Sequence, residues 1–154
     1  MQFHVWQDSW AQDPGWQRAV SDLKRDGLVG SVGISLNRWE PWNGLAAIRT
    51  GHIDAVQVVY NIFDQSPEDE LFPLCRERGV AIIARVPFDE GSLAEQLARD
   101  RVFPEGDFRR SYFNAENTAA TMDRIERLEA ILPAGMSLPG MALRFVISNP
   151  DVTT

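Results

Sequence analysis

Short runs of β-branched and apolar residues recur along this chain at a nearly constant interval, with helix-forming sequence between them. The runs "VGSVGIS" at 29–35, "AVQVVYNIF" at 55–63 and "VAIIARVPF" at 80–88 begin about 25 residues apart, and a shorter run, "FHVW" at 3–6, precedes them. Runs of this kind are typical of strands, and strands joined by helices at this interval lie parallel, linked by right-handed crossovers. The pattern therefore predicts an α/β fold with about four parallel strands.

The segments between the runs carry helix start and stop signals. Asp13 is a candidate N-cap and Pro14 a candidate first residue for a helix over 16–24, which Gly27 would end. A shorter helix is expected to end at Gly51.

A third helix is expected within "SPEDELFPLCRERG" at 66–79. Ser66 is the predicted N-cap and Pro67 the first residue, the acids of the first turn and the arginines of the last suit the helix dipole, and Gly79 is the predicted stop. The carboxylates of this segment are interpreted as a helix start rather than as a site.

Two architectures fit this alternation, an open doubly wound sheet and part of a (β/α)8 barrel. The glycines of "GLVGSVG" at 27–33 precede or lie within a strand and do not open a helix, so they do not match a nucleotide-binding turn. A complete barrel takes about 250 residues. The 154 residues leave room for about half of one.

The pattern changes after Phe88. A polar connection over 95–116 is followed by a helix over 118–132, whose apolar stripe comprises Met122, Ile125, Leu128 and Ile131.

A last helix would begin after Ser137 and end at Asn149, and the final "VTT" resembles the start of another strand. The chain is thus expected to be a single domain over 1–154, with βα units at 1–94, a loop at 95–116, and helices and the start of a strand at 117–154. Both ends fall at strands, as in a partial sequence.

Composition excludes several classes of function. The net charge is −7 and no basic cluster is present, so nucleic-acid binding is not expected, and no apolar run is long enough for a membrane span. Cys75 is the only cysteine, which excludes an intrachain disulfide and suits a reducing cytosol, so the expected location is cytoplasmic. His4 and His52 lie far apart in the sequence, and no metal site is expected.

Four segments together resemble the second half of the aldo-keto reductases: "LKRDGLVGSVGIS", "GHIDAVQVVYNIFDQ", "LFPLCRERGVAIIARVPFDEGSL" and "MALRFVISNPDVTT". The resemblance implies a partial (β/α)8 TIM barrel that begins at its fourth strand, with the eighth strand starting at "VTT". It also implies an oxidoreductase that uses NADP(H) to reduce small-molecule carbonyls, aldehydes or ketones, to alcohols.

The resemblance assigns roles to individual residues. His4, the catalytic candidate, would donate a hydrogen bond to the substrate carbonyl oxygen, and Ser35 and Gln57 would hold the nicotinamide carboxamide. Many members have an asparagine directly after this serine. Here Leu36 occupies that position, and Asn37, one residue later, is the candidate for the same role. Arg85 stands where many members place a tyrosine that stacks on the nicotinamide ring.

The segment at 87–93 resembles the loop that covers the cofactor pyrophosphate. Its candidate residues for cofactor binding are Pro87, Phe88, Gly91 and Leu93. Purely structural roles stay open for several residues of the predicted site: His4 as a core or edge residue, Gln57 as an amide satisfied inside the barrel, Ser35 as a turn or helix cap, and Arg85 as an ion-pair partner of the acids at 89 and 90.

The family's proton donor is a tyrosine assisted by a lysine and an aspartate, and the resemblance places all three on strands that this sequence does not contain. The only lysine is Lys24 and the only tyrosines are Tyr60 and Tyr112. Without a nearby cation the pKa of Tyr60 is expected to stay near 10.

The isolated chain is therefore expected not to reduce carbonyls. The resemblance also implies that the segment binding the cofactor's 2′-phosphate is missing, so NADP(H) binding is expected to be weak or absent. One alternative is a non-catalytic half-barrel that binds or supports another chain, or a second copy of itself. Another is an unrelated open α/β protein with a small-molecule site.

Overall fold

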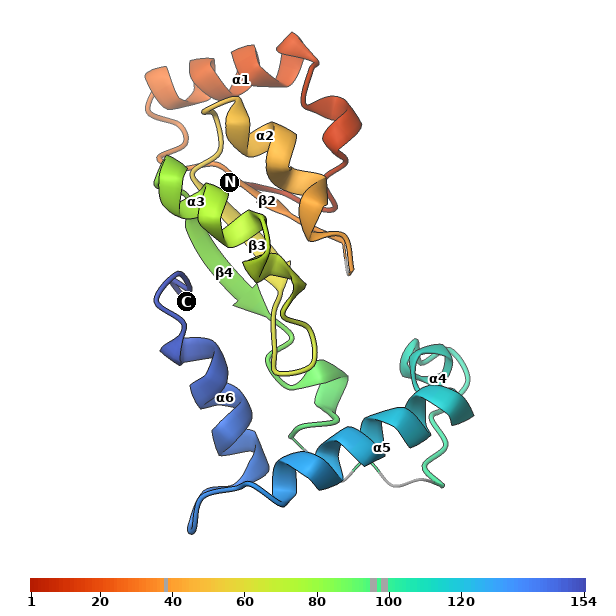
Figure 1. Ribbon diagram of the computed structural model, residues 1–154. Coiled ribbons are helices and arrows are strands. Elements are labelled where there is room, and N and C mark those ends of the chain that lie inside the picture. The colour runs from red at the N-terminus through yellow and green to blue at the C-terminus, as the bar shows by residue number, and fades with distance from the viewer. Residues whose placement is uncertain (38, 95–96, 98–99) are drawn as a thin grey trace. The chain divides into compact units, whose positions relative to one another are not determined.

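The computed structural model describes residues 1–37, 39–94, 97 and 100–154, and these residues contain one parallel sheet. Its strands follow one another in the sheet in the order of the sequence (Figure 1). They are β1 (Gln2–Phe3), β2 (Gly33–Ser35), β3 (Ala55–Val59) and β4 (Ala81–Arg85). The prediction of an α/β fold with about four parallel strands is thus confirmed.

Each pair of consecutive strands is joined through a helix. The connecting helices are α1 (Pro14–Arg25), α2 (Leu45–Arg49) and α3 (Leu71–Arg78). The helices after β4 are α4 (Arg109–Tyr112), α5 (Ala115–Glu129) and α6 (Leu138–Ser148). Short 3-10 helices are η1 (Asp8–Trp10), η2 (Pro41–Gly44), η3 (Ser66–Glu68) and η4 (Asp89–Gly91).

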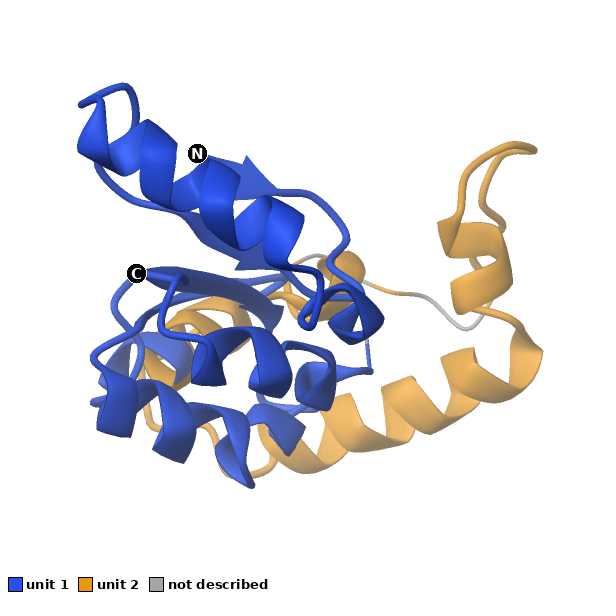
Figure 2. Ribbon diagram, turned by 90° about the horizontal axis from the view of Figure 1, so that it is seen from above, with its two compact units in different colours: residues 1–87, 146–154 blue, residues 88–145 orange. Residues whose placement is uncertain are grey.

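The chain divides into two compact units, coloured blue and orange in Figure 2. The first comprises residues 1–87 and 146–154 and holds the sheet, and the second comprises residues 88–145. The single domain over 1–154, with its parts at 1–94, 95–116 and 117–154, stays a prediction.

One face of the sheet is buried. Ile34, Val56 and Ile82 are register partners on β2, β3 and β4, and none is more than 1% exposed. Because side chains alternate between the two faces of a strand, Ser35 and Gln57 project from the opposite face. That second face is less covered, since Gln57 is only half-buried.

The strands are shorter than the predicted runs. β1 ends before His4, and Val5 then adopts a left-handed backbone with a φ of 57°. β4 ends at Arg85, and Val86 is left-handed as well, with a φ of 61°. A left-handed residue cannot continue a strand, so the apolar runs at 3–6 and 80–88 extend past the strands that they predict.

The start of α1 is confirmed and the start of α3 is not. The Asp13 carboxylate accepts the backbone N–H of Gly15 at 2.7 Å, as an N-cap should. Ser66 instead lies within η3 and its hydroxyl donates to Asp64 at 2.7 Å, so the prediction of Ser66 as the cap of the third helix was wrong. That helix begins only at Leu71.

The last two residues lie against the edge of β4. The N–H of Thr153 donates to the carbonyl oxygen of Ile82 at 2.9 Å, and the N–H of Ala84 donates to that of Thr154 at 2.8 Å. These bonds hold residues 153–154 beside β4, but the structure has no strand at 152–154, so the further strand at "VTT" stays a prediction.

In the second unit, the Asn114 side chain caps α5 by accepting the N–H of Asn117 at 2.9 Å. This cap makes the helix begin at Ala115, earlier than predicted. The stripe predicted for this helix is buried at Ile125, whereas Ile131 lies past the helix and is 67% exposed. Part of the predicted loop at 95–116, namely residues 95–96 and 98–99, lies outside the described residues.

Candidate functional site

Ser35 and Gln57 lie next to each other on the less covered face of the sheet. They are register partners on β2 and β3, and Ser35 is the last residue of its strand. Neighbouring strands are about 4.8 Å apart, so the two side chains project side by side. The structure thus brings together the two residues that the sequence predicts for carboxamide binding.

The Gln57 amide is already engaged on one side. Its Oε1 accepts the Nε2–H of Gln2, on β1, at 2.6 Å. Within the described part of the chain, neither Gln57 Nε2 nor the Ser35 hydroxyl has a hydrogen-bond partner. A donor amide and a hydroxyl therefore remain for a ligand.

The role of Gln2 was missed by the sequence analysis. The two glutamines are 55 residues apart, and only the register of β1 on β2 brings them together. Knowledge of that register is the one signal that would have found the pair.

Arg85 lies at the end of β4 on the same face as Gln57. Two residues before it, Ile83 is the register partner of Gln57. The Arg85 Nη2–H donates to the carbonyl oxygen of Leu36 at 3.2 Å, which places the guanidinium across β3 and next to the end of β2. A cation thus lies beside the predicted cofactor residues.

Asn37 is placed differently from Ser35. It is half-buried in the loop after β2, and its Nδ2–H donates to Glu40 Oε2 at 3.4 Å. Its side chain is therefore held by the loop to which it belongs.

His4 is exposed and lies in a bend directly after β1. The chain after it is fixed, because the Trp6 N–H donates to the carbonyl oxygen of Ser35 at 2.9 Å and the Trp6 ring is buried. His4 therefore lies at the carboxyl end of its strand, as predicted, and it is not a core residue. Its exposure excludes the core alternative, whereas a structural role at the edge of the sheet is untested, and the catalytic role stays a prediction.

Asn61, just after β3, was also missed by the sequence analysis. It is fully buried, and its Oδ1 accepts the backbone N–H groups of Phe63 at 2.8 Å and Asp64 at 2.9 Å. Its Nδ2–H donates to the carbonyl oxygen of Val86 at 3.0 Å. The signal in the sequence is an asparagine within the apolar run at 55–63, because an amide buried there needs hydrogen-bond partners.

Pro87 ends the first unit, and the other predicted loop residues belong to the second. The N–H groups of Gly91 and Leu93 both donate to the carbonyl oxygen of Phe88, at 3.0 and 3.1 Å. Contact of these two groups with a phosphate would require the turn to open.

The same turn is built around a buried acid. Asp89 is 4% exposed, and its carboxylate accepts hydroxyl hydrogen bonds from Ser92 at 2.8 Å and Tyr112 at 2.6 Å. In this conformation the side chains of the turn offer a phosphate a negative charge.

Nicotinamide dinucleotides fit this chain at one end only. The Ser35 hydroxyl and the Gln57 amide match a carboxamide, which needs both donors and acceptors. The turn that contains Asp89 does not match a pyrophosphate. Of the cofactor's groups, the carboxamide alone therefore matches the residues described.

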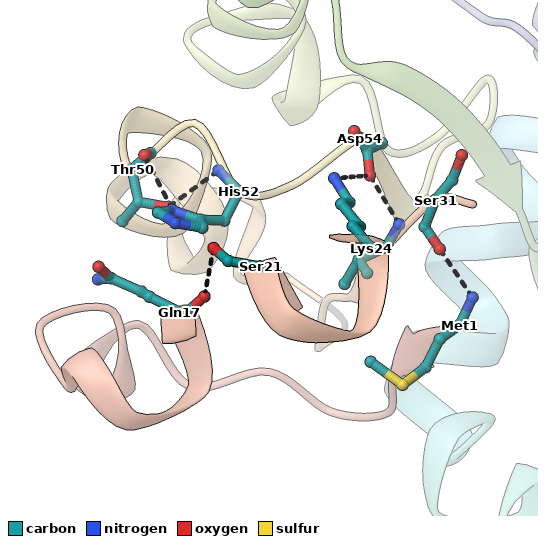
Figure 3. Close-up of polar contacts among 9 residues, drawn as sticks. Met1, Gln17, Ser21, Lys24, Ser31, Thr50, His52 and Asp54 are labelled. Carbon is teal, nitrogen blue, oxygen red and sulfur yellow. Dashed lines mark hydrogen bonds and ion pairs between the residues drawn. The ribbon is translucent and has the colours of Figure 1, made fainter. Parts of the chain in front are cut away.

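Lys24 lies at the opposite end of the strands from Ser35. Its ammonium binds Asp54 Oδ2 at 2.5 Å, just before β3, and the same oxygen accepts the N–H of Val32 at 2.7 Å (Figure 3). Burial raises the pKa of Asp54, but the hydrogen bonds from Lys24 and Val32 outweigh it, so the pKa is lower than usual.

Tyr60 lies at the other end of β3 and is buried. Its hydroxyl donates to Glu68 and accepts the Nδ2–H of Asn149 at 2.9 Å. Burial and the neighbouring Glu68 carboxylate raise the pKa of Tyr60 to about 12. The expectation that it stays near 10 was wrong, because burial and an adjacent acid both favour the neutral phenol.

Metal-site residues do not gather in the described part of the chain. No group of three or more histidine, cysteine, aspartate or glutamate side chains there could hold a metal ion. Among the helices of the same residues, none is both long and apolar enough to span a membrane.

Comparison with protein families and curated proteins gives one consistent result. The model of the aldo/keto reductase family matches residues 1–154. The NADH-specific methylglyoxal reductase of Escherichia coli is 25% identical over 134 residues, which cover 86% of this chain and 40% of that protein. The NADP(+) aldo-keto reductase yakc of Schizosaccharomyces pombe is 30% identical over 105 residues, which cover 64% of this chain and 31% of that protein. The chain spans less than half the length of these relatives.

Solved structures match the same part of the fold. A glycerol dehydrogenase from Gluconobacter oxydans has a TM-score of 0.73 at 23% identity and covers 98% of this chain and 46% of its own. An aldo-keto reductase from Bacillus halodurans in its holo form has a TM-score of 0.70 at 25% identity and covers 98% of this chain and 45% of its own. The prediction of a partial (β/α)8 barrel is confirmed by these matches.

Proposed function

The chain belongs to the aldo/keto reductase family, and from that premise we propose that its sheet carries the nicotinamide-binding side of an NADP(H)-dependent oxidoreductase site. The observation that supports this most directly is the pairing in register of Ser35, which is buried, and Gln57, which is half-buried. A buried hydroxyl and the Nε2–H group of a half-buried amide are costly to leave without a hydrogen-bond partner, so a carboxamide ligand suits them.

His4 is proposed to bind the substrate carbonyl. It is exposed at the carboxyl end of β1, where active sites of this fold are built. A neutral imidazole N–H there would donate a hydrogen bond to the carbonyl oxygen and stabilise the negative charge that develops on it. A reduced nicotinamide, when bound, supplies the hydride for such a reaction.

No tyrosine and lysine of the described residues lie together as a proton donor and its activating cation. Lys24 is bound to Asp54 before β3, and Tyr60 follows β3, which puts the two at opposite ends of a strand roughly 20 Å apart at 3.3 Å per residue. The Tyr112 hydroxyl donates a hydrogen bond to the Asp89 carboxylate. We propose that this chain alone does not reduce carbonyls.

A non-catalytic module is the second candidate. The observation that favours it is the engagement of both tyrosines with carboxylates, while the face with Ser35 and Gln57 remains suited to a ligand. In this case the chain would bind another chain or a second copy of itself and contribute the face without the chemistry.

The proposed function is tested by NMR titration of the isotope-labelled chain with NADPH at millimolar concentration. The side-chain amide signal of Gln57, assigned with Q57E, and the backbone signal of Ser35 should shift together. In the S35A/Q57L variant, which lacks the Gln57 side-chain amide, the backbone signals of residues 35 and 57 should no longer shift and binding should be lost. Shifts that avoid β2 and β3, or that persist in this variant, contradict the proposal.

Turnover tests the proposed lack of a proton donor, which both candidates share. NADPH oxidation with a small aldehyde should stay at background for the chain alone. Turnover by the purified chain would overturn our proposal that it lacks a proton donor.

A further inference from the structure

Val86, directly after β4, has a left-handed backbone with a φ of 61°. Valine is β-branched, and its Cβ substituents crowd the carbonyl in this region, so the conformation is an outlier for this residue type. Such residues persist only where their surroundings hold them, and they cluster at functional sites. The contacts of Val86 therefore indicate what holds it.

Asn61 holds the Val86 carbonyl. Two backbone N–H groups, from Phe63 and Asp64, point at Asn61 Oδ1, and only the oxygen of an amide accepts such bonds. The orientation of the amide is thus fixed, and its Nδ2–H must donate toward the Val86 carbonyl oxygen, 3.0 Å away. Asn61 is fully buried, so water cannot substitute for either partner.

Arg85 is held between the same two segments. The N–H of Tyr60 donates to the Arg85 carbonyl oxygen at 3.2 Å, so Tyr60 and Asn61 fix two successive carbonyl groups. The Arg85 side chain crosses the face of β3 that carries Gln57 and reaches the Leu36 carbonyl oxygen at 3.2 Å. Its Nε atom is buried.

We propose that Asn61 is a positioning residue for Arg85. Its hydrogen bond to the Val86 carbonyl keeps Val86 left-handed, and β4 therefore ends at Arg85. From that strand end the Arg85 guanidinium reaches across β3 to Leu36, beside the Ser35 and Gln57 pair. The significance of that pair rests on the proposed function, but the placement of Arg85 does not.

The test measures hydrogen exchange of the Arg85 Nε–H by NMR in the full chain, with R85K used to assign the signal. The N61D variant keeps an oxygen for Phe63 and Asp64 and removes the donor to Val86. We expect exchange at least about tenfold faster, because the end of β4 loosens. Adding V86G should bring the rate back to within about threefold of the wild type, because glycine adopts a left-handed backbone without strain.

Asn43, a half-buried residue of η2 that holds the segment after β1, offers a control. Its Nδ2–H donates to the Trp6 carbonyl oxygen at 2.8 Å and its Oδ1 accepts the N–H of Asp8 at 2.9 Å. N43D makes the same chemical change there and should leave the Arg85 exchange rate unaltered.

Three results would overturn the proposal: an unchanged rate in N61D, an equal acceleration in N43D, and no recovery when V86G is added. If N61D does not fold, folding of the double variant supports the proposal and its failure to fold overturns it. None of these measurements requires a bound nicotinamide, so failure of the proposed function is seen separately in the NADPH titration.

Discussion

The Asp8 carboxylate holds the start of a helix that lies far along the chain, because its Oδ2 accepts the N–H of Ala46, 38 residues away, at 2.8 Å. Its Oδ1 accepts the N–H of Ala47 at 3.1 Å and the indole N–H of Trp6 at 3.0 Å. The first N–H groups of a helix have no partner within it, so this one side chain satisfies two of them at α2. It thereby joins the segment after β1 to the helix after β2.

Removal of the Asp8 side chain should therefore destabilise the first unit strongly. We expect D8A to lower the free energy of unfolding by about 2–3 kcal/mol, since three donors lose their acceptor. D13A, which removes a single capping bond at α1, should cost about 1 kcal/mol. Urea unfolding measures both, and equal losses in the two variants would contradict a special role for Asp8.

The ion pair of Lys24 and Asp54 should contribute less than the hydrogen bond from Val32 to the same carboxylate. The two charged side chains are 30% and 41% exposed, so solvent screens their attraction, and K24M should cost less than about 1 kcal/mol. D54A should cost more, about 1–2 kcal/mol, because the Val32 N–H also loses its acceptor. A larger effect of K24M than of D54A in urea unfolding would disprove this order.

Acid should weaken the contacts of the Asp54 carboxylate with Lys24 and Val32. The pKa of Asp54 is lower in the folded chain than its usual value of 3.8, so the contribution is present above that pH and is lost as pH falls below it. The free energy of unfolding should be measured for the wild type and for D54A at several pH values between 6 and 3. The difference between the two proteins should shrink toward pH 3.

Alkaline pH should destabilise the first unit through Tyr60 and Cys75. Burial raises the pKa of the Tyr60 phenol and that of the Cys75 thiol to about 12, from usual values of 10.0 and 9.0. The folded state therefore retains these protons where the unfolded state loses them, and the free energy of unfolding falls from about pH 9 toward pH 12.

For Tyr60, whose pKa is raised from 10.0 to about 12, this fall in the free energy of unfolding is expected between pH 10 and pH 12. Y60F and C75A should each flatten part of this fall, Y60F above pH 10 and C75A from about pH 9. Unfolding by urea at intervals from pH 8 to pH 12 tests this, and slopes identical to the wild type in both variants would rule it out.

In the second unit, Y112F should loosen the turn at 88–93. The Asp89 carboxylate is buried and loses one hydroxyl donor in this variant, which should cost about 1–2 kcal/mol. Backbone hydrogen exchange of Gly91 and Leu93 should accelerate, whereas S111A, which changes the exposed neighbouring residue, should leave it unaltered. Unchanged exchange in Y112F would contradict this prediction, because it would mean that the hydrogen bond from Ser92 alone holds the Asp89 carboxylate and the turn.

The sequence predicts the sheet well because its signals are local. Apolar runs mark the strands, and the Asp13 cap and the left-handed Gly27 and Gly79 mark helix ends, each within a few residues of the element concerned. The strand ends could not be predicted, because Val5 and Val86 adopt a left-handed backbone that their residue type disfavours.

The candidate site was predicted only in part. Ser35 and Gln57 follow from the family resemblance and share a register, but the partners Gln2 and Asn61 depend on contacts across strands. A pairing over 55 residues leaves no periodic trace in the sequence. The pKa of Tyr60 was misjudged for the same reason, since burial and the Glu68 carboxylate act on it only in the folded chain.

Thr153 is hydrogen-bonded to Ile82, 71 residues earlier in the chain. The second unit is therefore part of a chain loop that this pairing closes. The entropy lost in closing a loop grows only with the logarithm of its length, and a doubling costs about 0.6 kcal/mol. Insertions and deletions within residues 88–145 should therefore leave the pairing at β4 almost unaffected. The length of residues 88–145 is therefore only weakly constrained by the pairing of Thr153 with Ile82.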